Sequence, residues 1–425
     1  MLGIEFIREN PQKVEAACRD KRADVSVDRI LELDARRREK LHTVEELRSE
    51  HNAASKSVAE KKKRGEDLDD TFRLLKELSQ RIKALEGELR ALDEQLDGLL
   101  IRVPNCPADT APPGPDAQSN VVRRTWGEPR EFAFQPRPHW ELGASLGGLD
   151  FERAAKLAGS GFALFTDRGA RLVRALINFM LDLHTAEHGY TEVWPPALAT
   201  RPCMTGTGQL PKLEADMYRC EEDDLFLIPT AEVPVTNIHR DEVLDGERLP
   251  IRYTAYSPCF RREAGSYGKD TRGLMRVHQF DKVELVKFVR PGTSYDELEG
   301  LVGDAEAVLQ RLGLHYRVVE LCRGDLSFAG AKCYDLDVWA PGIGRWQEVS
   351  SCSNFEDFQA RRSGIRFRDR GHKPQFVHTL NGSGVALARL ILALLEAYQE
   401  EDGSVVVPQA LRGYMGGLER LEPRE

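Results

Sequence analysis

The sequence predicts an α+β protein, with an N-terminal antiparallel two-helix coiled-coil arm and then a domain built on a mainly antiparallel β-sheet flanked by helices. Three observations predict this class. Leucine and isoleucine recur at alternating spacings of three and four up to Leu99, which is typical of a coiled coil. Prolines then interrupt the chain, and the residues after them combine amphipathic helices with paired strands. We expect an arm over residues 1–102, a proline-rich linker over 103–120 and a second domain over 121–425.

The composition is that of an ordinary folded chain. Of the 425 residues, 41% are hydrophobic and 30% are charged, which is usual for a mixed α/β protein. The N-terminus lacks a basic segment followed by an apolar one, and no apolar run approaches the roughly 18 residues of a membrane helix. We therefore expect a cytoplasmic protein with no membrane partner. The net charge of −9 is an average and does not exclude nucleic acid, because basic residues cluster locally.

The eight cysteines are scattered, and no two of them form a CxxC pair. Zinc ligands usually come in closely spaced pairs, and disulfide frameworks are typical of short secreted chains. We therefore expect reduced thiols, many of them in the core, and no structural zinc.

The predicted arm rests on two apolar seams of unequal strength. In the second seam every a and d position is apolar: Leu78, Ile82, Leu85, Leu89, Leu92, Leu96 and Leu99. The first seam, from Ile30 to Val58, is weaker because Arg37 and His51 interrupt it. Gly65 breaks the helix between the seams, so we expect a hairpin that reaches on the order of 50 Å at 1.5 Å per residue.

The tip of this hairpin carries a basic run of Lys61, Lys62, Lys63 and Arg64. Such a run can meet a phosphate backbone. From the residues alone, two other interpretations stay open: a dimerisation coiled coil, and a merely solvated charged surface.

Three segments of the second domain contain the residues that point to chemistry. Residues 161–198 predict a long amphipathic helix that ends at Gly189, then a short strand that ends in prolines. The stretch from Cys259 to Phe288 predicts a strand, a glycine-rich charged loop and a second strand. Near the C-terminus, a Gly-Ser-Gly turn is expected to open an apolar helix in which Arg389 is the one charge of the apolar stretch. Burial of an unpaired guanidinium is costly, so Arg389 should face a polyanion, or a carboxylate in a structural salt bridge.

In this order, the three segments resemble motifs 1, 2 and 3 of the class II aminoacyl-tRNA synthetases. The most specific match is the Phe-Arg-x-Glu sequence that starts at Phe260. The resemblance implies a homodimer, and it implies that Arg261 and Arg389 are catalytic through contacts with the ATP phosphates. A guanidinium suits this task because it can bind phosphate bidentately. The implied ATP-binding residues are Arg261, Arg262, Glu263, Val277, Phe280, Glu348, Val349, Ser350, Ser351 and Arg389.

Within this set, the resemblance implies particular contacts. Glu263 should accept a hydrogen bond from the adenine amino group, Val277 should offer its backbone, and Phe280 should stack on the ring. Val349 and Ser350 should complete a nucleotide-binding turn. Glu348 and Ser351 should hold Mg²⁺ on the phosphates, since Mg²⁺ prefers oxygen ligands.

Three further sequences, FLIPTAEVPVTN, FDKVELV and LNGSG, resemble the seryl subfamily of bacterial type. The implied serine pocket consists of Thr230, Ala231, Glu232, Arg261, Glu284 and Ser383. The sequence leaves open which carboxylate binds the ammonium group and which the hydroxyl group. Threonyl and prolyl enzymes are the nearest alternatives, but the helical arm and the short segment after motif 3 favour the seryl family. Arg262 and Tyr267 depart from common family choices, and neither removes a catalytic group.

The resemblance implies a serine–tRNA ligase that uses ATP with Mg²⁺ to form seryl-adenylate. The seryl group then passes to tRNA(Ser) and, where present, to tRNA(Sec). The tRNA should lie across the two subunits of the homodimer, with its acceptor end near Lys269 and Arg272 of the motif 2 loop. A synthetase scaffold that only binds tRNA would have lost one of the key charged residues, and all are present. A paralogue that loads a carrier protein would lack the arm.

Overall fold

The computed structural model describes residues 1–264 and 272–424. The chain forms two compact units, Met1–Pro104 and Asn105–Glu425. Each unit is described by itself below, and the predicted fold class is confirmed in both.

The first unit consists of helices. Two short helices, α1 (Ile4–Glu9) and α2 (Pro11–Asp20), precede the long helices α3 (Val27–Arg64) and α4 (Asp69–Leu100). The hydroxyl of Ser26 caps the start of α3 by accepting from the backbone N–H of Arg29 at 3.2 Å. Gly65 ends α3 in the left-handed conformation, with φ of 69°, which a residue without a Cβ adopts without strain.

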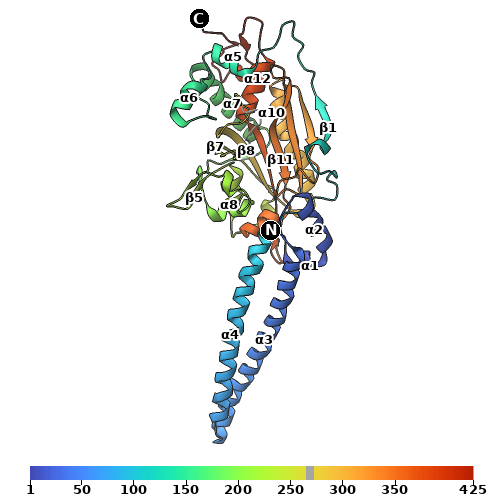
Figure 1. The fold of residues 1–425 in the computed structure, drawn as a ribbon, viewed down its shortest axis with the longest axis vertical. Helices are drawn as coiled ribbons and strands as arrows, with labels where there is room; N and C mark the ends of the chain where they lie inside the picture. Colours follow the sequence, from blue (N-terminus) through green and yellow to red (C-terminus); the bar gives the residue numbers. More distant parts are fainter. Residues whose placement is uncertain (265–271, 425) are drawn as a thin grey trace. The chain divides into compact units, whose positions relative to one another are not determined.

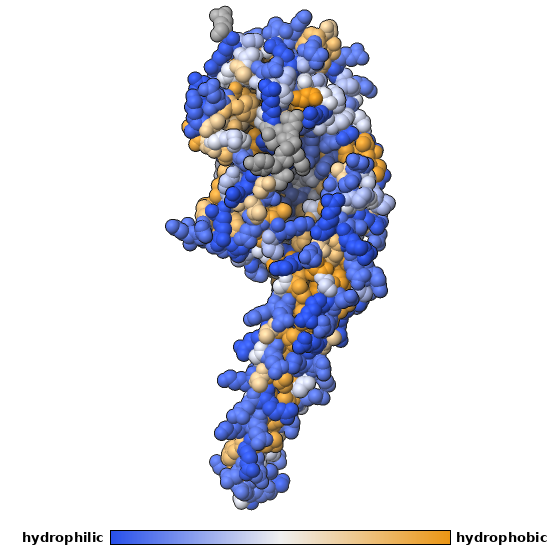
Figure 2. All heavy atoms as spheres, in the orientation of Figure 1, coloured by the Kyte–Doolittle hydropathy of each residue, from blue (hydrophilic) through white to orange (hydrophobic). Residues whose placement is uncertain are grey.

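The two long helices pair in antiparallel orientation along the predicted seam. Hydrophobic side chains form a strip between them, bordered by hydrophilic residues (Figure 2). The two polar interruptions of the seam both contact the opposite helix. Arg37 forms an ion pair with Asp93, and the His51 ring lies 3.1 Å from the Ser79 hydroxyl. Both polar residues of the seam therefore have a polar partner on the opposite helix.

The second unit is built on an eight-stranded sheet (Figure 1). Neighbouring strands are antiparallel except for the edge pair of β2 and β7, which is parallel. In spatial order the strands are β1 (Val121–Trp126), β9 (Tyr316–Glu320), β10 (Lys332–Ala340), β11 (Arg345–Asn354), β14 (His378–Ala386), β8 (Gln279–Val289), β7 (Ile251–Phe260) and β2 (Thr191–Glu192).

Three longer helices pack against this sheet and enclose the main core (Figure 1). They are α7 (Asp167–Ala186), α10 (Ser294–Arg311) and α12 (Leu387–Ala397). Shorter helices are α5 (His139–Ser145), α6 (Phe151–Ala158), α8 (Arg201–Thr207), α9 (Glu232–Thr236), α11 (Phe358–Ser363) and α13 (Gln409–Arg412). The helix and strand predicted over residues 161–198 correspond to α7 and β2.

Three small sheets complete the second unit. The first contains β3 (Leu198–Thr200), β5 (Leu225–Leu227) and β4 (Arg219–Cys220). The second contains β13 (Gln375–Phe376), β12 (Arg366–Arg368) and β6 (Val243–Asp245), and the third pairs β15 (Val405–Val406) with β16 (Arg420–Leu421).

The structure corrects two local expectations. The Gly-Ser-Gly sequence lies inside strand β14 and is not a turn before α12. Its glycines are required by close packing: a Cβ on Gly384 would lie 2.6 Å from Nε2 of His184, and one on Gly382 would lie 2.8 Å from Sγ of Cys352. Likewise, Glu348, Val349, Ser350 and Ser351 are part of strand β11 and do not form a nucleotide-binding turn.

The proline-rich segment after the arm is irregular, as its prolines predict, but residues 105–112 are held to the second unit. The amide of Asn105 donates to the carbonyl oxygens of Ala329 and Phe355 at 2.9 and 2.8 Å. Ala111 is buried in a small cluster with Leu321 and Leu326. This part of the segment therefore belongs to the second unit and is not a free linker.

Two further properties concern the described residues as a whole. Among the helices of these residues, none combines the length and the apolar character needed to cross a bilayer. The eight cysteines all lie in the described ranges and are free thiols, six of them buried.

Candidate active site

A cavity of about 330 Å³ opens on the second unit, lined by residues of β8, β11 and β14 and by the start of α12. The floor of the cavity is polar because side chains alternate between the two faces of each strand, so that every second residue faces the cavity. On β8, Phe280 and Lys282 line the cavity, whereas Val283 and Leu285 point into the core. On β14, Asn381 and Ser383 line the cavity in the same way.

One end of the cavity combines a guanidinium with an aromatic ring. The guanidinium carbon of Arg261 lies 5.1 Å from the centre of the Phe280 ring, and Nε of Arg261 donates to the Pro229 carbonyl at 3.4 Å. Glu263 lines the same end and forms an ion pair of 2.9 Å with Arg276. The arrangement suits a planar ring with attached phosphate.

Arg389 also lines the cavity. Its NH1 group donates to the Glu348 carbonyl at 2.8 Å and lies 3.5 Å from the Glu348 carboxylate. Its Nε donates to the Met275 carbonyl at 3.2 Å. The guanidinium is therefore orientated by strand β11 and by the segment that precedes β8 before any anion binds, which lowers the reorganisation that phosphate binding requires.

The oxygen atoms next to Arg389 fit a magnesium ion bound together with phosphate. Glu348 supplies a half-exposed carboxylate, and Ser351 supplies a hydroxyl from the same strand. Asp335 lies opposite Ser351 in the β10–β11 register, and burial beside Glu348 raises the pKa of Asp335 well above its usual range. Carboxyl oxygens are thus gathered where a hard cation would favour their ionised form.

The other end of the cavity is small, polar and closely hydrogen-bonded. The Glu284 carboxylate is fully buried beneath it. Oε2 accepts from the Thr230 hydroxyl at 2.9 Å and pairs with the Lys282 ammonium at 2.7 Å, and Oε1 accepts from the Asn381 amide at 2.9 Å. Three donors therefore compensate for the burial of this charge.

A second carboxylate, Glu232, lines the same end and is 6% exposed. Burial and, as a smaller cause, the charge of Glu284 together raise the pKa of Glu232 to about 7. A hydrogen bond from Gln359 and the charges of Lys282 and Arg261 oppose this rise. The pocket thus offers two carboxylates with different environments, which suits a small substrate with an ammonium and a hydroxyl group.

Comparison with known proteins places this geometry in a family. The "Seryl-tRNA synthetase N-terminal domain" matches residues 1–107, and the "tRNA synthetase class II core domain (G, H, P, S and T)" matches residues 216–398. Serine–tRNA ligase of Geobacter sulfurreducens is 56% identical over 422 residues, which cover 99% of this chain and 100% of that protein. This chain belongs to the seryl-tRNA synthetase family.

Further relatives agree. Serine–tRNA ligase of Pelotomaculum thermopropionicum is 56% identical over 421 residues, covering 99% of this chain and 100% of that protein. The crystal structure of seryl-tRNA synthetase from Pyrococcus horikoshii, complexed with ATP, matches with a TM-score of 0.94 and 40% identity over 100% of both chains. The protein is thus an ATP-dependent class II synthetase, as its motifs predicted.

Most of the residues predicted for the synthetase site line the one cavity. These are Thr230, Glu232, Arg261, Glu263, Val277, Phe280, Glu348, Val349, Ser351, Ser383 and Arg389. Glu284 lies directly beneath them.

The other predicted residues are placed elsewhere. Ala231 packs into the core. The hydroxyl of Ser350 points under the cavity and donates to the Ser383 carbonyl at 2.6 Å. Arg262 is exposed and its guanidinium lies over the Tyr218 ring. These three side chains therefore do not line the cavity. Each of them either points to the opposite face of its strand or follows a turn of the chain.

The predicted tRNA contacts that the structure describes do not line the cavity. Arg272 lines a separate open hollow, where its guanidinium stacks 4.6 Å from the Trp140 ring centre. Lys62, Lys63 and Arg64 are exposed at the end of α3, whereas Lys61 donates to the Thr71 hydroxyl at 3.0 Å. Lys269 and Tyr267 lie outside the described residues. Among the residues that the structure describes, no group of three or more His, Cys, Asp or Glu is arranged around a metal position.

Sequence reasoning missed several residues of the synthetase site. Lys282, Asn381, Gln359 and Arg276 all contact a predicted residue directly. Lys282 and Asn381 had a detectable signal, because each lies two residues from a predicted site residue on a strand and so shares its face. Gln359 had no such signal, since it reaches Glu232 from a helix that is distant in sequence.

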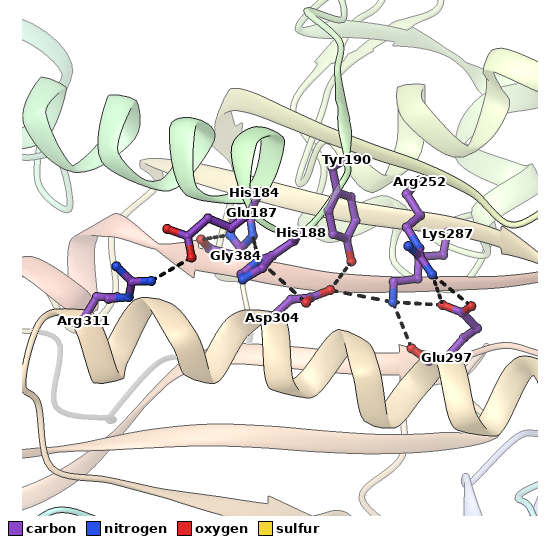
Figure 3. Close-up of polar contacts among 10 residues, drawn as sticks. All are labelled: His184, Glu187, His188, Tyr190, Arg252, Lys287, Glu297, Asp304, Arg311 and Gly384. Carbon is purple, nitrogen blue, oxygen red and sulfur yellow. Dashed lines mark hydrogen bonds and ion pairs between the residues drawn. The ribbon is translucent and has the colours of Figure 1, made fainter.

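A network of polar groups connects α7, α10 and strand β14 (Figure 3). Nε2 of His184, on α7, lies 3.0 Å from the carbonyl oxygen of Gly384, the residue after Ser383. Nδ1 of His184 lies 2.9 Å from the His188 ring, which faces Asp304 at 3.7 Å. Asp304 also accepts from the Tyr190 hydroxyl at 2.7 Å. Because a carbonyl oxygen only accepts, Nε2 of His184 holds a proton. Burial lowers the pKa of His184 to about 4 and thus keeps the ring neutral.

Proposed function

We propose that this serine–tRNA ligase carries out both of its chemical steps in the cavity between Arg261, Arg389 and Glu284. The observation that carries the proposal is the division of the cavity into two ends. A guanidinium-and-aromatic end suits ATP, and a small end with two carboxylates suits serine. Arg261 lines both ends and would align the two substrates.

In the first step, an oxygen of the serine carboxylate attacks the α-phosphorus of ATP. The bond between the α-phosphorus and the bridging oxygen breaks, and pyrophosphate leaves. Arg261 and Arg389 stabilise the negative charge that builds on the phosphate oxygens, while Glu263 and Phe280 hold the adenine. In the second step, a hydroxyl of the terminal tRNA ribose attacks the seryl carbonyl and AMP leaves.

The small end of the cavity selects serine over other amino acids. We infer that Thr230, Glu232, Glu284 and Ser383 bind the amino and hydroxyl groups of serine. Alanine would leave polar groups of the pocket without a partner, which costs binding energy. The size of the pocket would limit threonine. Magnesium would be held by Glu348 and Ser351, and it would supply positive charge that neutralises the phosphates.

The partners of the reaction are also part of this proposal. They are tRNA(Ser) and, where present, tRNA(Sec), with the arm residues Lys61–Arg64 and the loop residues Lys269 and Arg272 as contacts. A homodimer with tRNA across both subunits, in the cytoplasm, completes the proposal. The support for these points is the family membership and the exposed basic residues at the end of α3.

The test is serine-dependent exchange of pyrophosphate into ATP by the full chain. Arg261→Ala should lower the exchange rate at least 100-fold, the size of effect seen when one donor to a developing oxyanion is removed. The matched control is Arg311→Ala, which removes an exposed guanidinium paired with Glu187 on the surface. Near-normal exchange by Arg261→Ala would contradict the proposal.

A further inference from the structure

Gln359 lies outside the cavity, on α11, and is fully buried. Its amide nevertheless contacts the serine end through Glu232. We propose that Gln359 is a positioning residue that fixes the orientation of the Glu232 carboxylate and thereby sets the affinity for serine. The inference rests on the proposed function of Glu232 and extends it to a residue behind the pocket wall.

The hydrogen bonds of Gln359 define its orientation uniquely. Nε2 donates to Oε1 of Glu232 at 2.6 Å and to the Thr207 carbonyl at 3.2 Å. Oε1 accepts from the Thr379 hydroxyl at 2.8 Å. A rotated amide would direct its oxygen at two acceptors, the carbonyl and the carboxylate, so only the observed orientation satisfies all three partners.

This orientation matters because of the charges around Glu232. Glu284 repels a negative charge on Glu232, while Lys282 and Arg261 attract it. The amide of Gln359, which does not line the cavity, donates the hydrogen bond that holds Oε1 of Glu232. With that oxygen held, the direction of the second oxygen is determined, and the carboxylate lines the serine end in one orientation.

Removal of the Gln359 donor should therefore weaken the binding of serine and leave the binding of ATP unchanged. Gln359 contacts two residues that line the cavity, the Glu232 carboxylate and the Thr207 backbone. The residues proposed for adenine and phosphate are held by other groups, such as Glu348 for Arg389 and Arg276 for Glu263. Loss of a hydrogen bond to a charged group costs roughly 1.5–3 kcal/mol, which is about 10- to 100-fold in an equilibrium constant.

The first experiment compares Gln359→Leu with Gln399→Leu in pyrophosphate exchange. Gln399 is an equally buried glutamine with three hydrogen bonds, to Arg137 and to the Glu396 carbonyl. We expect Gln359→Leu to raise the KM for serine at least about tenfold and to leave the KM for ATP within about twofold. Gln399→Leu should change neither. An unchanged KM for serine, or an equal rise for both substrates, would overturn the inference.

A second readout separates positioning from general damage. The Gln359 bond lowers the pKa of Glu232, so its removal should shift the Glu232 inflection in the pH profile of the serine KM to higher pH. The groups that face Glu232 are Glu284, Lys282 and Arg261, and all stay in place in the variant. An unmoved inflection would contradict the inference.

Thr379→Val decides the question if Gln359→Leu does not fold. It removes only the hydroxyl that orientates the amide. Its matched control is Thr236→Val, because the buried Thr236 hydroxyl has no hydrogen-bond partner in the described structure. We expect a several-fold rise in the serine KM for Thr379→Val and none for Thr236→Val. Equal behaviour of the two would contradict the inference.

Glu232→Gln distinguishes failure of the inference from failure of the proposed function. If Glu232→Gln leaves the serine KM unchanged, the proposed role of Glu232 itself is wrong. If it impairs serine binding while Gln359→Leu does not, only the positioning role of Gln359 is wrong.

Discussion

His139 and Glu396 form a fully buried pair, with Nδ1 of the ring 2.8 Å from Oε1 of the carboxylate. The opposite ring nitrogen accepts from the Leu274 amide at 3.0 Å, so the ring is neutral and its proton is on Nδ1. Glu396 lies on α12, the helix that contains Arg389, and Leu274 precedes Met275, whose carbonyl binds Arg389. The pair thus joins the two segments that hold the arginine.

His139→Leu should destabilise the protein because it leaves the Glu396 carboxylate buried without this partner. We expect the free energy of unfolding in urea to fall by about 3 kcal/mol. His372→Leu, at an exposed histidine, is the control and should change it by less than about 0.5 kcal/mol. Equal stability of the two variants would mean that the pair contributes no net stabilisation.

His184 predicts a loss of stability in mild acid. Burial lowers the pKa of His184 from 6.5 to about 4. Between these pH values the unfolded chain binds a proton at His184 that the folded chain does not. The free energy of unfolding should therefore decrease by about 3 kcal/mol as the pH falls from 6.5 to 4. His184→Gln keeps a donor for Gly384 and removes the titration, so urea unfolding between pH 7 and pH 5 should depend less on pH. If the free energy of unfolding depended on pH with the same slope in His184→Gln and in the unchanged protein, this prediction would be refuted.

Glu232 predicts the opposite dependence. Its pKa is raised from 4.5 to about 7, so the unfolded chain releases this proton at lower pH than the folded chain. Stability of the substrate-free protein should be lost as the pH rises through that window, by on the order of 3 kcal/mol at most. Glu232→Gln should therefore raise the Tm at pH 8 while it raises the KM for serine. A lower Tm at pH 8 would show that the ionised carboxylate is well compensated.

Gly384→Ala tests the close approach of β14 to His184. The added Cβ would lie 2.6 Å from the ring, so the strand or the ring must move, and Ser383 is the adjacent residue. We expect a loss of stability of about 1–3 kcal/mol and a higher KM for serine. Gly87→Ala is the control, because its Cβ meets nothing within 4 Å inside α4; it should stabilise by about 0.5–1 kcal/mol. A similar gain at Gly384 would contradict the packing argument.

The sequence predicted those features that depend on local patterns. The leucine spacing predicted the arm, and Gly65 predicted the break between its two helices. The Phe-Arg-x-Glu sequence identified the hairpin of β7 and β8. Arg37 and His51 looked like defects of the first seam, yet they pair with Asp93 and Ser79. Their partners lie on the returning helix, and sequence spacing alone does not determine that register.

Features that depend on contacts between distant segments could not be predicted. The Gly-Ser-Gly sequence looked like a turn because glycine permits turns, but at Gly384 it permits the approach of His184. Gln359 reaches Glu232 across 127 residues, and no periodicity connects them. In such cases the residue type is compatible with several structures, and tertiary packing selects one.

We propose that this chain activates serine with ATP in the cavity of the second unit. The most direct measurement is pyrophosphate exchange into ATP by the full chain with each of the twenty amino acids at equal concentration. We predict a clear preference for serine, with threonine, glycine and alanine far below it, and loss of the serine signal in Arg261→Ala. A preference for any other amino acid would contradict it.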